Sequence, residues 1–187
     1  MGAHEISQLT LRTKRLLLRP LRPSDDSALL GIFSDPKVMR YWSTPPWRSI
    51  DQARSMIERD TVAMRAGEHL RLGIERLGDA SLIGTCTLFA FSEQCRRAEM
   101  GYVLASQAWG QAYMDETLRA LMTYGFTELN LNRIEADVDP KNIASAKSLE
   151  RLGFIKEGHL RERWIVGDEV SDTALYGLLR RDWHWRA

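Results

Sequence analysis

Apolar residues recur along this chain in short strand-like runs and in longer stretches with helical spacing. Runs typical of strands lie at residues 16–21, 70–77, 82–91, 98–104, 133–138, 155–163 and 173–179. Helical patterns begin at Ser24, at Ser49, near Gln111 and at Asn142. The resulting order, β-α-α-β-β-β-α-β-α-β-β, predicts an α+β fold with a mixed sheet and helices on both of its faces.

The stretch Gln107–Tyr113 joins the strand at 98–104 to the longest helical pattern and has the composition of an anion-binding turn. Gly110 and Ala112 are small enough for a phosphate to approach the backbone, and a helix N-terminus attracts negative charge. No Gly-Lys-Ser/Thr follows, and the three glycines of a dinucleotide fingerprint are missing. The residues alone leave two interpretations open, an anion site or a helix start with small residues for close packing.

Length, charge and cysteine content set the outer limits of the interpretation. The 187 residues are enough for one domain with a sizeable core, which we place at residues 11–187 after a flexible leader at 1–10. A net charge of +1 gives no electrostatic case for nucleic acid or for an anionic membrane surface as a partner. The sequence has no 18-residue apolar run and no secretory signal. Two cysteines in such a chain predict a reduced, cytoplasmic protein, and the four scattered histidines predict no metal site.

The chain resembles a known enzyme family through three motifs that occur in the expected order. These motifs are Gln107-x-x-Gly110-x-Ala112, Asn142-x-x-Ser145 and Leu152-Gly153-Phe154. Together they are similar to motifs of the GCN5-related N-acetyltransferase (GNAT) superfamily, and residues 98–113 are similar to its RimJ/RimL-type branch. The resemblance extends from about Leu11 to Trp183. It implies a largely antiparallel seven-stranded sheet whose fourth and fifth strands splay apart to form a cleft for acetyl-CoA, with no metal.

The resemblance also implies which residues hold the acetyl-CoA. Tyr102, Val103 and Leu104 would pair with the pantetheine amides as an additional strand does, and Asn142 would hold the cofactor from the next helix. The phosphate turn would consist of Gln107, Trp109, Gly110, Gln111, Ala112 and Tyr113. Asn142 has a simpler alternative role as the N-cap of its helix.

Acetyl transfer to an amine requires a base, stabilisation of an oxyanion and a proton donor for the leaving thiolate. Glu99 is the candidate base, because strand alternation places it beside Gly101 and Val103 in a half-buried position that raises a carboxyl pKa. The alternative is an ion pair between Glu99 and one of the many arginines. Ser145, one helical turn after Asn142, is the candidate acid that the resemblance implies.

The function that follows is acetyl-CoA-dependent N-acetyl transfer, made directly in a ternary complex. The resemblance implies a protein N-terminal amine as the acceptor, with a homodimer as a possible assembly. Residues 41–47 would form one wall of the acceptor pocket, and Trp164 with the turn at 167–169 the other. Two alternatives stay open: a small amine such as a polyamine, an amino acid or an antibiotic as the acceptor, and a sensor that binds CoA without catalysis.

Overall fold

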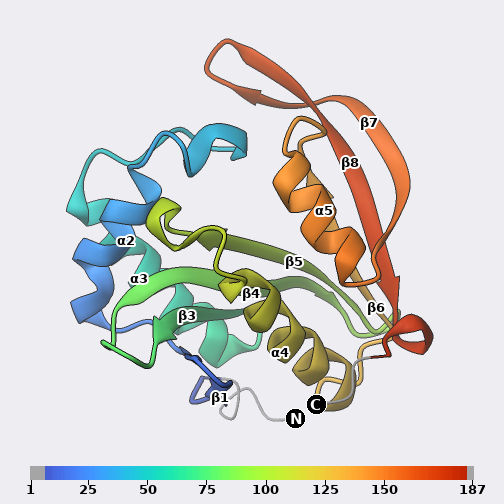
Figure 1. Cartoon of the computed structure of the whole chain (residues 1–187), viewed down its shortest axis with the longest axis horizontal. Helices are drawn as coiled ribbons and strands as arrows, with labels where there is room; N and C mark the ends of the chain where they lie inside the picture. Colours follow the sequence, from blue (N-terminus) through green and yellow to red (C-terminus); the bar gives the residue numbers. More distant parts are fainter. Residues whose placement is uncertain (1–6, 185–187) are drawn as a thin grey trace.

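A mixed sheet of eight strands organises the computed structural model, which describes residues 7–184 (Figure 1). The strands are β1 (Leu11–Arg12), β2 (Leu16–Arg19), β3 (Leu70–Arg76), β4 (Leu82–Ser92), β5 (Arg97–Leu104), β6 (Arg133–Val138), β7 (Ile155–Val166) and β8 (Glu169–Leu179). Their order across the sheet is β1-β2-β3-β4-β5-β6-β8-β7. All pairs are antiparallel except β5 with β6, so the predicted largely antiparallel α+β fold is confirmed.

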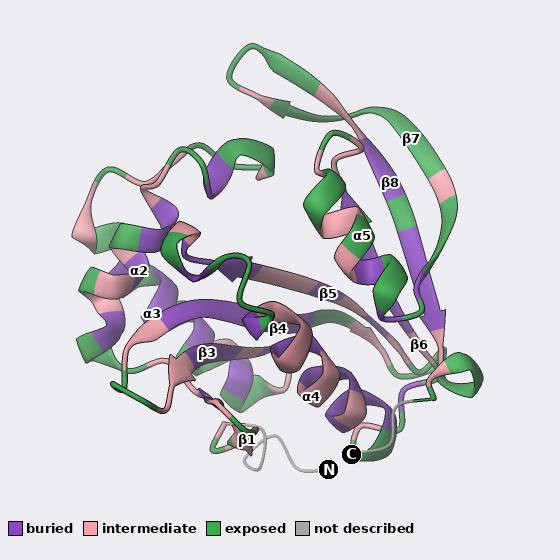
Figure 2. Cartoon of the chain, in the orientation of Figure 1, coloured by how far each residue is buried: buried purple, intermediate pink, exposed green. Residues whose placement is uncertain are grey.

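The helices cover both faces of this sheet, as predicted. They are α2 (Asp26–Phe33), α3 (Ile50–Ala66), α4 (Tyr113–Thr127) and α5 (Ile143–Arg151). Met100 and Leu104 of β5 belong to the same buried cluster as Leu118 of α4, whereas Val103 packs with Leu29 of α2. Because neighbouring residues of a strand point to opposite faces, α4 and α2 lie on opposite sides of β5 (Figure 2).

Two details of the prediction were wrong. The sheet has eight strands and not seven, because β1 is only two residues long and leaves no periodic pattern. Ser24 does not cap a helix; residues 23–25 form a 3₁₀ turn instead. The Asp25 carboxylate determines this conformation, since it accepts the Arg22 N–H at 2.7 Å and pairs with the buried Arg19 guanidinium at 2.8 and 2.9 Å.

The structure describes neither the start of the predicted leader at residues 1–10 nor the last residues of the predicted domain at 11–187. Residues 1–6 and 185–187 are not described, so the leader stays a prediction there. Within the described part, Leu9 packs against the core.

The feature that positions the site is the separation of β5 from β6. Their parallel pairing covers only residues 97–99 with 133–135, whereas β5 stays paired with β4 as far as Leu104. The Ala105 N–H donates to Ile83 O at 2.8 Å, and alternation along the ladder then directs the Val103 peptide groups toward β4. The peptide groups of Tyr102 and Leu104 consequently face the gap between β5 and β6.

Candidate active site

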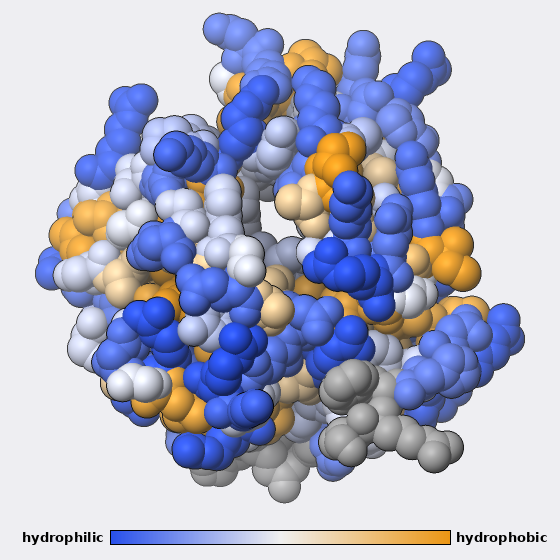
Figure 3. Space-filling model, viewed as in Figure 1, coloured by the Kyte–Doolittle hydropathy of each residue, from blue (hydrophilic) through white to orange (hydrophobic). Residues whose placement is uncertain are grey.

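A cleft of about 580 Å³ opens where β5 and β6 separate. One wall is the segment between α2 and α3, which contributes the side chains predicted for it: Tyr41, Trp42, Ser43, Thr44 and Trp47. The opposite wall includes Trp164 of β7, also as predicted. Arg40 forms an ion pair with Glu169 at 3.1 Å, which links the two walls at the rim. Figure 3 shows the molecule hollowed between these walls.

The turn at 107–113 has the backbone of an anion-binding loop. Gly110 has φ +73° and Ala112 has φ +59°, so the chain turns twice through the left-handed region before α4 begins. A Cβ built on Gly110 would meet no atom within 4 Å, so this side of the loop is open. Ala112 is the N-cap of α4 and has no side-chain acceptor for the first-turn N–H groups, which stay available to an anion.

The predicted phosphate-loop residues have different structural roles. The Trp109 indole donates to Leu104 O at 2.8 Å and ties the loop to the end of β5. The Gln111 side chain donates to Gln107 O at 3.2 Å, and the side chains of both glutamines are exposed. Tyr113 is buried below the loop. Of the three strand residues expected to pair with pantetheine, Tyr102 and Leu104 direct peptide groups to the gap and Val103 does not.

Ser145 does not stand alone, because its hydroxyl oxygen lies 2.6 Å from the phenol oxygen of Tyr102. This contact joins β5 to α5 across the gap, and both side chains line the cleft. Burial is the main cause that raises the pKa of Tyr102 to about 12, so the phenol stays protonated at neutral pH. Sequence reasoning assigned Tyr102 only a backbone role. Strand alternation, which we applied to Glu99, could also have placed Tyr102 on the face that α5 covers.

Asn142 is the N-cap of α5, which was the simpler of its two interpretations. Its side-chain oxygen accepts the Ser145 N–H at 3.2 Å, so the same residue that starts the helix also fixes the position of Ser145. The amide group lines the cleft and can still meet a ligand through its N–H groups.

Glu99 lines the cleft beside a second carboxylate that sequence reasoning missed, Asp137 of β6. Burial raises the pKa of Glu99, and the negative charges of Asp137 and Glu135 raise it further. Burial also raises the pKa of Asp137, against the nearby positive charge of Arg163 and a hydrogen bond from Trp164. Among residues 7–184 no lysine or arginine forms an ion pair with Glu99, so the alternative role predicted for it is not seen.

Two further properties of the described residues complete the site. No helix within residues 7–184 is long and apolar enough to cross a membrane. In the same part of the chain, no cluster of three or more histidine, cysteine, aspartate or glutamate side chains has the arrangement of a metal site.

Comparison with known proteins agrees with this geometry. Residues 15–155 match the family model described as acetyltransferase (GNAT) domain. The chain is 38% identical over 174 residues to the uncharacterized N-acetyltransferase p20 of Bacillus licheniformis, covering 93% of this chain and 98% of the relative. It is 37% identical over 113 residues to the putative ribosomal N-acetyltransferase YdaF of Bacillus subtilis, covering 59% and 62%.

Solved structures give the same fold. Mycobacterium smegmatis RimJ in complex with CoA-disulfide superimposes with a TM-score of 0.83 at 24% identity, covering 95% of this chain and 88% of RimJ. Spermidine N-acetyltransferase from Vibrio cholerae in complex with CoA and spermine gives a TM-score of 0.80 at 24% identity, covering 91% and 98%. The chain therefore belongs to the GNAT family of N-acetyltransferases. Its catalytic class is acyltransferase, and its place in the RimJ/RimL-like branch stays a prediction.

Proposed function

We propose that this enzyme transfers the acetyl group of acetyl-CoA directly to the N-terminal amine of a protein. The observation that carries the proposal is the placement of Glu99 and Tyr102 on opposite faces of β5, at the edge of the same gap in the sheet. An amine and a thioester that enter from opposite faces would meet in this gap, with a carboxylate on one side and a phenol on the other.

The residues around the gap fit acetyl-CoA. The open loop at Gly110 and the first-turn N–H groups of α4 would hold the pyrophosphate, where the helix dipole favours negative charge. The peptide groups of Tyr102 and the N–H of Leu104 would pair with the pantetheine amides. Asn142 would contact the cofactor from the opposite side of the gap.

The transfer then needs one proton acceptor and one hydrogen-bond donor. Glu99, directly or through water, would take a proton from the ammonium group, and the free amine would attack the thioester carbonyl carbon. The amine adds to give a tetrahedral oxyanion, and the C–S bond breaks as this intermediate collapses. The second proton lost by the nitrogen is passed on to the departing sulfur, so the products are an acetylated amine and the CoA thiol. The Tyr102 hydroxyl, with Ser145 beside it, would donate to the departing sulfur. A backbone N–H of β5 at the gap would stabilise the oxyanion.

The charges in the cleft favour an acceptor with a single positive charge. Glu99, Asp137 and Asp139 can attract an ammonium group, but Arg59, Arg163 and Arg71, which is paired with Asp60, line the same cleft. A polyamine carries several positive charges, and some of them would lie near these arginines at a cost in free energy. A protein N-terminus has one ammonium group followed by neutral peptide groups, which fits mixed charge better. A small amine is the second candidate, because one of the structural neighbours is a spermidine N-acetyltransferase.

Substitution of the candidate base tests this proposal. Glu99→Gln should lower kcat by about 10²-fold, the scale of general base catalysis, and remove the acidic limb of the pH–rate profile. The Kd for acetyl-CoA should stay within about twofold of wild type, because Glu99 faces the acceptor side of β5. Glu93→Gln, in the exposed turn after β4, is the matched control and should leave both values unchanged. An unaltered pH profile in Glu99→Gln would assign the base to another group.

The setting and assembly of the enzyme are part of the same proposal. Cys86 and Cys95 are both free thiols, which fits a reducing cytoplasm. A homodimer stays a prediction.

A further inference from the structure

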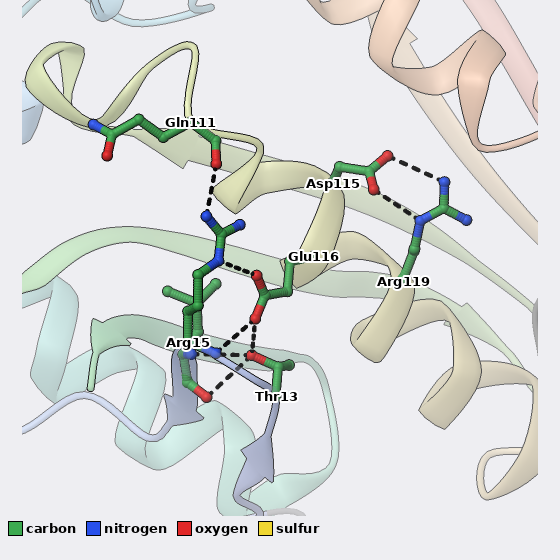
Figure 4. A network of polar contacts seen from close by, with 7 residues as sticks. Thr13, Arg15, Gln111, Asp115, Glu116 and Arg119 are labelled. Carbon is green, nitrogen blue, oxygen red and sulfur yellow. Dashed lines mark hydrogen bonds and ion pairs between the residues drawn. The ribbon is translucent and has the colours of Figure 1, made fainter. Parts of the chain in front are cut away.

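A polar network below the phosphate loop connects it to the turn between β1 and β2. Arg15 is the centre of this network, and Figure 4 shows its guanidinium between Gln111 and Glu116. Its Nη1 donates to Gln111 O at 3.0 Å, and its Nε donates to the Glu116 carboxylate at 2.7 Å. The same carboxylate accepts the Arg15 N–H at 2.8 Å and the Thr13 hydroxyl at 2.6 Å. The guanidinium lies 4.5 Å from the centre of the Tyr113 ring.

These contacts fix one peptide group in the loop. The peptide bonds of residues 7–184 are trans, so the C=O of Gln111 and the N–H of Ala112 point in opposite directions. Arg15 holds this C=O toward the β1–β2 turn, and the Ala112 N–H must therefore point away from that turn. This peptide joins Gln111 to Ala112, and Ala112 has a positive φ that a non-glycine residue adopts only at a cost, so without a contact that holds it the peptide could flip.

We propose that Arg15 is a positioning residue for acetyl-CoA: by holding the Gln111 carbonyl, it turns the Ala112 N–H toward the phosphates. The inference rests on the proposed cosubstrate site. Arg15 itself touches no phosphate in this arrangement, because its guanidinium is engaged by Glu116 and Gln111. Glu116 and Thr13 hold Arg15 in place, so residues about 100 positions apart in sequence determine the shape of one loop.

This role requires the forked guanidinium and not only a positive charge. Arginine can donate to Glu116 through Nε and to Gln111 through Nη1 at the same time, from a rigid planar group. A lysine ammonium is a single point on a flexible stem and can satisfy the carboxylate without reaching the carbonyl. Arg15→Lys therefore keeps the charge and separates positioning from electrostatic attraction of the phosphates.

The test compares two acetyl donors that differ in their phosphates, acetyl-CoA and S-acetyl-pantetheine. Arg15→Gln and Arg15→Lys should both raise the KM for acetyl-CoA by about tenfold, the effect of losing one charge-strength hydrogen bond. The kcat/KM for S-acetyl-pantetheine should not change, because that donor has no phosphate to contact the loop. Arg54→Gln is the matched control, since Arg54 forms its ion pairs with Asp26 at 3.0 Å and Asp51 at 3.7 Å away from the loop, and both donors should behave as with wild type.

Each outcome of this comparison either supports or overturns the positioning role of Arg15. A higher KM for acetyl-CoA alone supports the positioning role, whereas an equal loss with both donors, or no loss with either, overturns it. If Arg15→Gln does not fold, Arg15→Lys gives the same comparison with the ion pair retained. Wild-type enzyme that does not bind acetyl-CoA would instead refute the proposed function, so the two failures are distinguishable.

Discussion

Replacing Tyr102 by phenylalanine removes one hydroxyl from the cleft and keeps the ring that packs beside the core. The lost contact is the 2.6 Å hydrogen bond to Ser145, and a bond of this kind contributes about 0.5–1.5 kcal/mol net to stability. Ser145 is only half-buried and can bond to water instead, so the loss should be at the low end of that range. For a chain of this length the melting temperature should then fall by about 2–4 °C or less.

The effect on catalysis should be much larger than the effect on stability. Loss of a general acid lowers the rate by about 10²-fold or more, whereas the Kd for acetyl-CoA should hardly change because the variant keeps the proposed backbone contacts and the hydroxyl acts on the sulfur only as it departs. Burial raises the pKa of the phenol to about 12, so it stays protonated in the wild type at neutral and mildly alkaline pH. Titration of Tyr102 should therefore cause no fall in kcat between about pH 7 and 10.

The assay is the steady-state rate of thiol release by wild type, Tyr102→Phe, Ser145→Ala and the double variant. If the two hydroxyls act as one unit, the double variant should be about as slow as the slower single variant. If Tyr102→Phe keeps the wild-type kcat and Ser145→Ala is slow, Tyr102 is not the general acid and Ser145 takes that role.

Two further substitutions test the cleft and the loop. Asp137→Asn removes a negative charge that raises the pKa of Glu99, so the acidic limb of kcat/KM should move to lower pH; a limb that stays in place would show that the two carboxylates do not interact. Gly110→Trp should raise the Kd for acetyl-CoA by about 10²-fold or more in calorimetry, because the side chain fills the phosphate approach and left-handed backbone disfavours it by about 1–2 kcal/mol. The folded state should survive that cost, and unchanged affinity would contradict the assignment of the turn.

The sequence predicted those helices and strands whose apolar residues recur with a regular period. The buried strands and the helices have an apolar period of their own, and Ser49 and Asn142 cap their helices as their side chains suggest. The two errors arise where no period exists. β1 has only two residues, and the helix does not begin at Ser24 because the Asp25 carboxylate is bound to the buried Arg19 guanidinium and to the Arg22 N–H.

The site was harder to predict because its parts meet only in three dimensions. Glu99 could be found from its position within one strand, but Asp137 comes close only because β6 lies beside β5. Arg15 lies 96 residues before the carbonyl that it holds, and no spacing in the sequence indicates such a contact. Tyr102 is different, since alternation along β5 places its side chain on the face opposite to Glu99, although sequence reasoning assigned it only a backbone role.

The most direct measurement is calorimetric titration of the wild-type enzyme with acetyl-CoA, followed by thiol release in the same samples with N-terminal peptides and spermidine. We predict one binding site per chain and thiol release that depends on the peptide. Thiol release with spermidine but not with peptides would show that the acceptor is a small amine. Binding of acetyl-CoA without thiol release from any acceptor would support a CoA sensor without catalysis. Absence of acetyl-CoA binding would contradict the central claim, because the loop at Gly110 would then hold no phosphate.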